Sequence, residues 1–323
     1  MKKKSASAKQ VYGLADLRDW SKATQDVAPP IRLGVFGDPV AHSLSPQMQN
    51  AALKHCKIDT QYVRFQISPG ELRESLKLIC DLKFVGVNLT VPHKIAALKL
   101  VDDLEESAKS IGAVNAVKID PLRVGGDGFV EANNGKLHGL NTDGKGFARA
   151  IREEFVVDLR DLRVMILGAG GAARAIAMQC AKENSERLVI ANRTLEKGKR
   201  LADELRDFFT GPRVLGPVAR LQAIAWDEAA FRFQIGNVDL IVNATPLGLN
   251  RSDPSPIPAR LLAPHLMVYD TIYSERRTPF VSAAVEAGAR GANGLSMLLH
   301  QGALAFEIWF GREAPLDVMR AAL

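Results

Sequence analysis

The stretch VMILGAGGAARAIA, residues 164–177, decides the fold of the second half of this chain. An apolar run typical of a buried strand leads into Gly168, Gly170 and Ala173, spaced as G-x-G-x-x-A, and an alanine-rich helical pattern follows. Gly168 permits a tight turn, Gly170 lets a pyrophosphate approach the backbone, and Ala173 allows close helix–strand packing. Because a helix N-terminus attracts anions, phosphates are expected there. The residues expected to contact a dinucleotide are Gly168, Ala169, Gly170, Gly171 and Ala172.

A turn of small residues can also serve packing alone, but a strand before it and a helix after it favour the nucleotide interpretation. The next strand pattern ends in ANRT, and Asn192 lies 24 positions after Gly168, near the position at which dinucleotide folds read the ribose. An NAD enzyme would carry Asp or Glu there. This chain has Asn192, Arg193 and Thr194, with Lys197 one helical turn further on.

Two cations and a hydroxyl at this position suit a 2′-phosphate, which a guanidinium can bind in a fork and a carboxylate would repel. Arg193 and Lys197 could instead belong to a solvated helix face. Their place at the end of the second strand favours NADP over NAD.

Strand and helix patterns alternate along the rest of the chain, which predicts an α/β protein with mainly parallel sheets covered on both faces. The expected strands are 31–37, 60–67, 84–91, 163–168, 187–192, 221–226, 238–245 and 266–273. The expected helices are 45–56, 69–81, 172–183, 194–209, 295–311 and 315–323. The NTDG sequence marks a domain boundary near 142–144, and residues 1–30 read as an extension with a short helix in LADLRDW.

Composition excludes several classes of protein. The chain has 323 residues, of which 47% are hydrophobic, and a net charge of +6 that suits anionic small molecules but not nucleic acid, which usually needs a clustered basic stripe. Its three cysteines form no metal-binding or disulfide pattern, so no metal is expected. The lysines at the start are followed by no apolar signal core, and no later run is long enough for a membrane span. A cytoplasmic protein is expected.

A second set of candidate residues surrounds VNLTVPHKIAALKL, residues 87–100. Asn88 and Thr90 come at the end of a strand pattern, and Lys94 falls in the first turn of the helix that follows. A cation is disfavoured at that end of a helix, so its presence there calls for a reason. Earlier in the chain, HSLSP puts Ser43 and Ser45 at the start of another helix. Ser45 fits an N-cap with proline after it, and two hydroxyls at a helix N-terminus also suit a carboxylate.

Together these motifs resemble those of the shikimate dehydrogenases. The resemblance runs from Leu33 to Gly311 and rests on GDPVAHSLSP, NLTVPHK, GAVNA, GLNTDG, GAGGAARA, ANRT, NATPLG and NGLSMLLHQGALAFEIW, in that order. It implies reduction of 3-dehydroshikimate to shikimate with NADPH, on the route to aromatic amino acids. It also implies an N-terminal α/β substrate domain completed by C-terminal helices, 31–142 with 294–323. A Rossmann-type NADP-binding domain, 143–293, would follow, with the site in a cleft between the two domains.

The resemblance also implies roles for individual residues. Ser43 and Ser45 would hold the substrate carboxylate, with Tyr273 nearby, and Lys94 and Asp143 would be the catalytic pair. The ring hydroxyls would be bound by Asn88, Thr90, Asn115, Asp143 and Gln301. The residues expected at the coenzyme, besides the glycine loop, are Asn192, Arg193, Thr194, Lys197, Thr245 and Gly294.

The chemistry explains the lysine at the helix start. A ketone that accepts hydride needs a proton at its oxygen, and both the helix dipole and partial burial favour an amine that gives up its proton. Taken singly, Lys94 would be a surface lysine and Asp143 a helix cap. Together with Asn88 and Thr90 at one strand terminus, they favour an active site.

Two residues depart from the family pattern: Ala116 stands where threonine is common, and Thr271 stands where a methionine near the nicotinamide is common. Two rival functions remain open, an NAD-dependent quinate/shikimate dehydrogenase and a non-catalytic ligand-binding protein of the same fold. The intact Ser43 and Ser45 favour shikimate over quinate, and a pure binder has no reason to pair Lys94 with Asp143. We expect a monomer or a homodimer.

Overall fold

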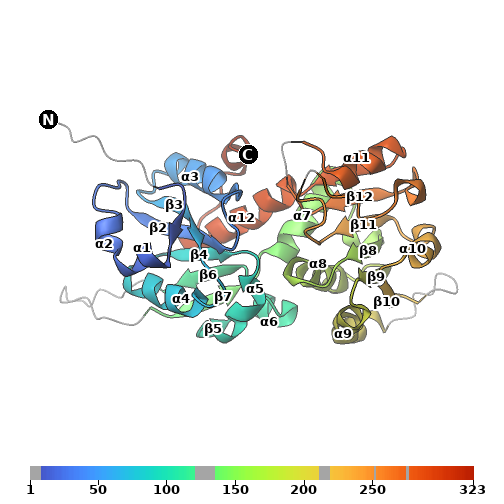
Figure 1. Ribbon diagram of the computed structural model, residues 1–323, viewed down its shortest axis with the longest axis horizontal. Coiled ribbons are helices and arrows are strands. Elements are labelled where there is room, and N and C mark those ends of the chain that lie inside the picture. Colours follow the sequence, from blue (N-terminus) through green and yellow to red (C-terminus); the bar gives the residue numbers. More distant parts are fainter. Residues whose placement is uncertain (1–8, 121–134, 211–218, 251, 274–275) are drawn as a thin grey trace. The chain divides into compact units, whose positions relative to one another are not determined.

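The computed structural model describes residues 9–120, 135–210, 219–250, 252–273 and 276–323. The chain folds into two compact units (Figure 1). Unit 1 comprises Met1–Thr142 and Gly302–Leu323, and unit 2 comprises Asp143–Gln301. In the part of the chain that is described, no helix combines the length and the apolar character that crossing a bilayer would require.

Unit 2 contains one six-stranded sheet in the order β10-β9-β8-β11-β12-β13, in which all neighbouring strands are parallel. The order reverses direction between β8 and β11, as in dinucleotide-binding folds. The strands are β8 (Arg163–Leu167), β9 (Arg187–Asn192), β10 (Leu221–Ala225), β11 (Leu240–Asn243), β12 (Met267–Asp270) and β13 (Arg290–Asn293). Because both faces of this sheet are covered, its central strands are apolar almost without interruption and fully buried.

The helices of unit 2 connect these strands. They are α7 (Asp143–Phe155), α8 (Gly171–Lys182), α9 (Leu195–Leu205), α10 (Glu228–Ile235), α11 (Pro279–Glu286) and the first part of α12 (Leu295–Phe310), with 3₁₀ turns η2 (Leu159–Asp161), η3 (Arg206–Phe209) and η4 (Ala259–Leu261). β13, α10 and α11 were not expected from the sequence pattern. The other predicted strands and helices of this unit are present, with ends shifted by up to two residues in most cases.

Unit 1 contains a mixed seven-stranded sheet in the order β1-β3-β2-β4-β6-β7-β5. β1 to β4 are mutually parallel, whereas β6 runs antiparallel to both of its neighbours. The strands are β1 (Tyr12–Gly13), β2 (Ile31–Gly37), β3 (Gln61–Gln66), β4 (Gly86–Leu89), β5 (Asp103–Leu104), β6 (Ala116–Ile119) and β7 (Leu137–Leu140). The prediction of mainly parallel sheets therefore holds for all of unit 2 and for every strand of unit 1 except β6.

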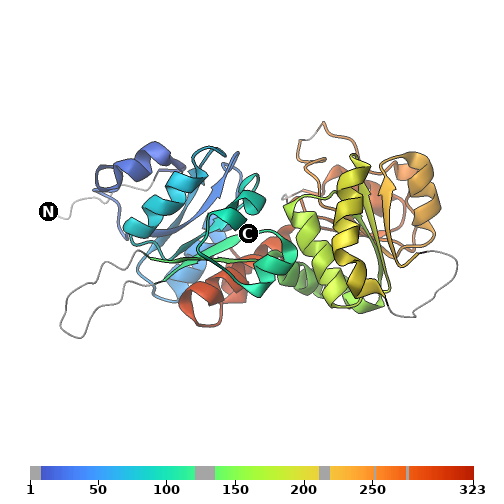
Figure 2. The ribbon, with the colours of Figure 1, turned by 90° about the horizontal axis from the view of Figure 1, so that it is seen from below.

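Helices cover both faces of this second sheet. In Figure 2, helices α1 (Leu14–Arg18), α2 (Trp20–Ala23) and α4 (Leu72–Asp81) lie on one face, and the red C-terminal helices lie on the other. The remaining elements are α3 (Ser45–His55), α5 (His93–Ala96), η1 (Ala97–Lys99), α6 (Glu106–Ile111) and α13 (Leu316–Arg320).

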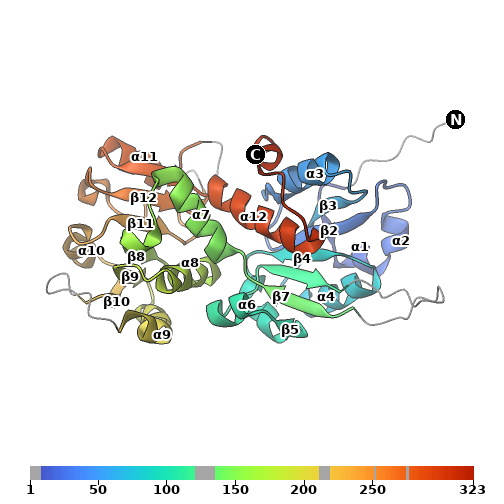
Figure 3. The same ribbon diagram turned by 180° about the vertical axis from the view of Figure 1, so that it is seen from behind.

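The chain returns from unit 2 to unit 1 within helix α12, at Gln301–Gly302, eight residues later than the expected start at 294. The first half of α12 packs beside α7, where His300 Nε2 lies 2.8 Å from Glu153 Oε2 (Figure 3). The second half packs in unit 1, where Trp309 Nε1 donates to the Val117 carbonyl at 3.1 Å. Because this helix packs on both units, the contact-based division falls within it and not at the expected residue 294.

The expected N-terminal extension, 1–30, is also revised, because its described part belongs to the core of unit 1. β1 is the edge strand of the sheet and pairs in parallel with β3, and Tyr12 is almost fully buried. The Trp20 ring lies 6.0 Å from the Phe65 ring and 5.5 Å from the Phe84 ring, centroid to centroid. The helix expected in LADLRDW forms as α1, followed directly by α2.

Candidate active site

The glycine loop lies at the carboxyl end of β8, where Gly168 has a φ of +114°. The positive φ favours glycine here, and a Cβ at this position would also lie only 3.1 Å from the Ala244 carbonyl oxygen. Gly170 is the N-cap of α8, and a Cβ there would meet nothing within 4 Å. Ala173 is fully buried against the sheet. Open space above the backbone at a helix N-terminus fits a pyrophosphate.

The residues expected at the ribose lie at the end of β9. Asn192 donates from Nδ2 to the Thr194 carbonyl at 2.8 Å, which closes the turn into α9. Thr194 is the N-cap of that helix, and Arg193, Thr194 and Lys197 are exposed. Within the described ranges neither Arg193 nor Lys197 forms an ion pair, whereas Lys199 on the same helix bonds Glu196 at 2.9 Å. Two cations without carboxylate partners at this edge suit a 2′-phosphate.

Two further loops of unit 2 lie at the carboxyl ends of β11 and β12. Asn243 Oδ1 accepts hydrogen bonds from the Thr245 backbone N at 3.1 Å and from its hydroxyl at 2.7 Å. Asn243 Nδ2 donates to Asp270 Oδ1 at 3.0 Å. Sequence reasoning missed both Asn243 and Asp270, although each is a polar residue that ends an apolar strand pattern, the signal already used for Asn88.

Gly294 follows β13 and lies against the loop after β12. A Cβ on Gly294 would come within 2.3 Å of the Thr271 carbonyl oxygen, so glycine is required for this close approach. Thr271, the residue that departs from the family pattern, donates its backbone N–H to the Asn243 carbonyl at 2.9 Å. Tyr273 is half-buried two residues further on.

Asp143 is the first residue of α7 and is only 4% exposed. Two glycines let this helix approach its neighbours. A Cβ on Gly144 would lie 3.1 Å from the Ala175 carbonyl oxygen of α8, and a Cβ on Gly146 would lie 2.8 Å from the Gln301 backbone N of α12. Gln301, itself 9% exposed, donates from Nε2 to the Leu298 carbonyl at 2.8 Å. The first turn of α7 is therefore placed between the coenzyme-loop helix and the helix that carries Gln301.

In unit 1, Ser43 and Ser45 follow β2 and are both buried. The Ser45 backbone N donates to Ser43 Oγ at 3.3 Å. The N-cap of α3 is Leu44 and Ser45 is the first helical residue, which corrects the expectation of Ser45 as the cap. Arg64, which sequence reasoning missed, donates from Nε and Nη2 to the Ser43 carbonyl at 2.9 and 2.6 Å. It fixes this loop and adds a positive charge that favours a carboxylate.

Asn88, Thr90 and Asn115 lie at β4, which pairs with β2, and just before β6, which pairs with β4. Asn88 lies within β4, where its Oδ1 accepts from the Tyr62 hydroxyl at 2.8 Å and its Nδ2 donates to the Asn115 carbonyl at 3.2 Å. Thr90 follows the strand and donates its backbone N–H to the Phe36 carbonyl at 2.9 Å. Ala116, the other departure from the family, is a fully buried core residue of β6.

Asn115 forms a reciprocal pair with Thr142. Its Nδ2 donates to Thr142 Oγ1 at 2.9 Å, and its Oδ1 accepts from the Thr142 backbone N at 2.8 Å. The residue just before Asp143 is therefore held firmly in unit 1.

Lys94 is the second residue of α5, a single turn that continues as η1, and is half-buried. Its carbonyl accepts from the Val114 backbone N at 2.8 Å. The neighbouring His93, also missed from the sequence, is buried, and its Nε2 lies 2.8 Å from the Ile67 carbonyl oxygen. Burial lowers the pKa of His93, so the neutral ring carries its proton on Nε2 and donates it to that carbonyl. This contact fixes the start of the helix that carries Lys94.

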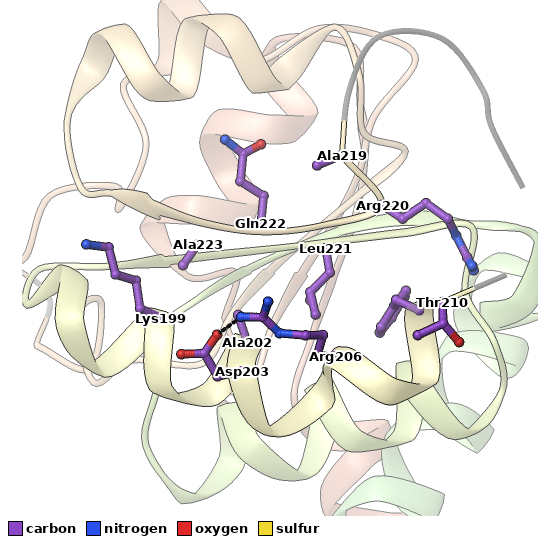
Figure 4. Close-up of a pocket in the computed structure, with 11 residues that line it drawn as sticks. Lys199, Ala202, Asp203, Arg206, Thr210, Ala219, Arg220, Leu221, Gln222 and Ala223 are labelled. Atoms are coloured by element: carbon purple, nitrogen blue, oxygen red, sulfur yellow. Dashed lines mark hydrogen bonds and ion pairs between the residues drawn. The ribbon is translucent and has the colours of Figure 1, made fainter. Parts of the chain in front are cut away.

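Each unit thus brings its own candidate residues to the carboxyl ends of parallel strands, where α/β folds bind ligands. Unit 1 gathers Ser43, Ser45, Asn88, Thr90, Lys94 and Asn115. A cavity between α9 and β10 in unit 2, shown in Figure 4, is lined by none of the predicted residues. Its side chains come mostly from α9, η3 and the edge strand β10, and they include the ion-paired Asp203 of α9 and Arg206 of η3.

The fold of unit 2, its glycine loop and the two cations at the ribose position define a dinucleotide-dependent oxidoreductase with a second, substrate-binding unit. Sequence comparison makes the class specific. Residues 35–117 match the shikimate dehydrogenase substrate binding domain, 150–213 match shikimate/quinate 5-dehydrogenase, and 294–323 match the shikimate 5′-dehydrogenase C-terminal domain. The chain belongs to the shikimate dehydrogenase family.

Individual relatives agree. The shikimate dehydrogenase (NADP(+)) of Methanopyrus kandleri is 42% identical over 293 residues, which cover 90% of this chain and 94% of the relative. A crystal structure of a shikimate dehydrogenase in complex with NADP+ is 37% identical, with a TM-score of 0.78 over 91% of this chain and 94% of the other. The Thermus thermophilus enzyme, solved in complex with NADP(H) and shikimate, is 34% identical, with a TM-score of 0.73 over 90% of this chain and 98% of the other.

The packing of Gly146 on Gln301 yields a test. We expect Gly146→Ala to lower the free energy of unfolding by about 1–3 kcal/mol, the usual cost of overpacking, because the new methyl group meets backbone atoms. Gly236→Ala is the matched control, since a Cβ there meets nothing within 4 Å and its φ of −70° is ordinary. Urea unfolding of both variants measures the difference, and equal stabilities would contradict the contact.

Proposed function

We propose that Lys94 and Asp143 are the acid–base pair of this NADP-dependent shikimate dehydrogenase, which interconverts 3-dehydroshikimate and shikimate on the route to chorismate and aromatic amino acids. The observation that carries the proposal is the set of polar residues that follow or end the parallel strands β2 and β4 in unit 1, β4 being the strand after which the turn with Lys94 begins. It combines two serines and an arginine suited to a carboxylate with amides and a hydroxyl suited to ring hydroxyls. We further propose a cytoplasmic enzyme that is a monomer or a homodimer.

The substrate carboxylate is held by the Ser43 and Ser45 hydroxyls at the start of α3. The N-terminus of that helix and the Arg64 guanidinium, bonded to the Ser43 carbonyl, both add positive potential there. Asn88, Thr90 and Asn115 bind the ring hydroxyls from unit 1. From unit 2, Gln301 binds a ring hydroxyl and Tyr273 lies near the carboxylate.

The proton is given and taken by Lys94. Lys94 lies in the first turn of α5 and is half-buried. Donation to the carbonyl oxygen completes the reduction, and the positive charge stabilises the alkoxide as it develops. Asp143 accepts a hydrogen bond from a substrate hydroxyl and orients the ammonium. His93 and the Val114–Lys94 backbone hydrogen bond fix the turn that presents the amine.

NADPH, when bound, supplies the hydride. The residues that fit it are the glycine loop at the start of α8, where Gly170 leaves open space, and the Arg193–Lys197 pair at the end of β9. Thr245 and Gly294 belong to the loops at the ends of β11 and β13, which suit the nicotinamide half. These residues bind and orient the coenzyme without taking part in proton transfer.

One experiment tests the two alternative functions, a quinate dehydrogenase that uses NAD and a ligand-binding protein without activity. Steady-state kinetics with shikimate and quinate, each with NADP+ and NAD+, should give the highest kcat/KM for shikimate with NADP+. A higher value for quinate with NAD+ would replace this function with that of a quinate dehydrogenase. Binding of shikimate without turnover under any condition would indicate a ligand-binding protein.

We expect Lys94→Ala to lower kcat by ~10²-fold or more, the typical effect of removing an acid–base group, while shikimate still binds. Lys99→Ala is the control, because Lys99 is an exposed lysine on the next turn. Initial rates measure kcat, and a shikimate-induced rise in melting temperature measures binding. Unchanged turnover in the Lys94 variant would remove this amine from the mechanism.

We expect Arg193→Ala to raise KM for NADPH by about 10- to 100-fold, the range for one hydrogen bond to a charged group, and to leave KM for NADH nearly unchanged. Arg200→Ala, at an exposed arginine of α9, the helix that follows Arg193, controls for net charge. Equal effects of Arg193→Ala on the two coenzymes would place the 2′-phosphate elsewhere.

A further inference from the structure

Asp270, the last residue of β12, carries a carboxylate that is completely buried. In the part of the chain that the structure describes, no lysine, arginine or histidine pairs with it. The charged side chains nearest to it along the described chain, Arg276 and Arg277, are exposed. An ionised carboxylate inside a protein is costly unless it is bonded, so its hydrogen bonds need an explanation.

Three segments donate to this one carboxylate. Oδ1 accepts from Nδ2 of Asn243, the last residue of β11, at 3.0 Å and from the Ile272 backbone N at 3.1 Å. Oδ2 accepts from the Thr278 hydroxyl at 2.6 Å. Thr278 in turn caps α11, because its Oγ1 accepts from the Val281 backbone N at 3.3 Å.

Two of these segments hold the loops after β11 and β13, which are proposed for the nicotinamide half of the coenzyme. Asn243, oriented by Asp270, holds both the backbone and the hydroxyl of Thr245. The Ile272 carbonyl accepts from the Gly294 backbone N at 3.1 Å. The loops after β11, β12 and β13 therefore share one anchoring group, which itself lies too deep to be an exposed ligand.

We propose that Asp270 is a positioning residue for the coenzyme, acting through Asn243 and Ile272 to hold the loops that carry Thr245 and Gly294. The proposal rests on the function proposed above, because its readout is the KM for NADPH. It assigns a role to a residue that touches neither the substrate nor the reacting atoms.

The ionised form is the one that fits the donors. Burial raises the pKa of Asp270 to about 6, and its hydrogen bonds to Thr278, Ile272 and Asn243 oppose that rise. At pH 8 the carboxylate accepts all three bonds. A protonated Asp270 must donate its own proton, and the acceptor beside Oδ2 is the Thr278 oxygen, which already accepts from the Val281 N–H. The Thr278 hydroxyl proton then loses the carboxylate as its acceptor. The groups that pack on the carboxylate from β11, the 271–273 segment and α11 contribute hydrogen-bond donors and no charge.

Asp270→Asn reproduces the protonated form, because its amide must donate on one side. At pH 8 we expect KM for NADPH to rise about tenfold, the effect of one lost hydrogen bond to a charged group, with KM for shikimate changed much less. The ratio of variant to wild-type KM should fall toward one at pH 5, where Asp270 itself is protonated. Using the ratio removes the titration of the coenzyme 2′-phosphate, which occurs near pH 6 in both proteins. Asp227→Asn is the matched control, since Asp227 caps α10 through the Ala230 N–H.

Stability separates positioning from a merely structural role. Since folding raises the pKa of Asp270, the stabilisation from its proton is present below about pH 4 and is lost as pH rises through about 6. The variant carries no charge to bury, so its melting temperature at pH 8 should equal or exceed that of the wild type although KM rises. An unchanged KM ratio at pH 8, or a fall in melting temperature that accounts for all of the activity loss, would overturn the proposal. Failure of the wild type to oxidise shikimate would contradict the proposed function instead.

Discussion

The reciprocal pair between Asn115 and Thr142 is the constraint on which the candidate site depends. The Asn115 carbonyl accepts a hydrogen bond from the Asn88 side-chain amide, and Asn88 Oδ1 accepts one from the Tyr62 hydroxyl. One hydrogen-bonded chain therefore runs from β3 to Thr142, the residue before Asp143. The residue next to Asn115, Val114, donates to the Lys94 carbonyl. Because every member of this chain is buried, a lost bond would leave an unsatisfied polar group in the core rather than one that water could satisfy.

Close approach is the second requirement, and glycine supplies it where helices and loops must meet. Gly144 and Gly146 let the first turn of α7 lie against both α8 and α12, and Gly294 lets the loop after β12 pass beside the start of α12. Two buried polar residues also hold loops together. Asn243 and Asp270 are fully buried at strand ends, and each connects segments that are distant in the sequence.

The strands, the glycine loop and most of the helices could be predicted from the sequence, because each depends on a short local pattern. The G-x-G-x-x-A spacing and the apolar runs at 163–168 and 187–192 identify strands and a turn without reference to the rest of the chain. What could not be predicted depends on contacts between distant residues. The sequence pattern did not show that Arg64 bonds Ser43, that Asp270 bonds Thr278, or that Tyr12 and Trp20 pack on Phe65. The return at Gly302 was missed for the same reason, since helix periodicity does not reveal that one helix packs on two units.

The short strand β1 has a consequence for the edge of its sheet. β3 would otherwise present unpaired backbone groups at its outer side, beside the aromatic rings of Phe65 and Phe84. Exposed strand edges of that kind recruit other chains, and proteins commonly cover them. The pairing of Tyr12–Gly13 with Phe65–Gln66 covers this edge of β3. A shortened version of this protein that began at Ile31 would keep every candidate active-site residue and would be prone to self-association.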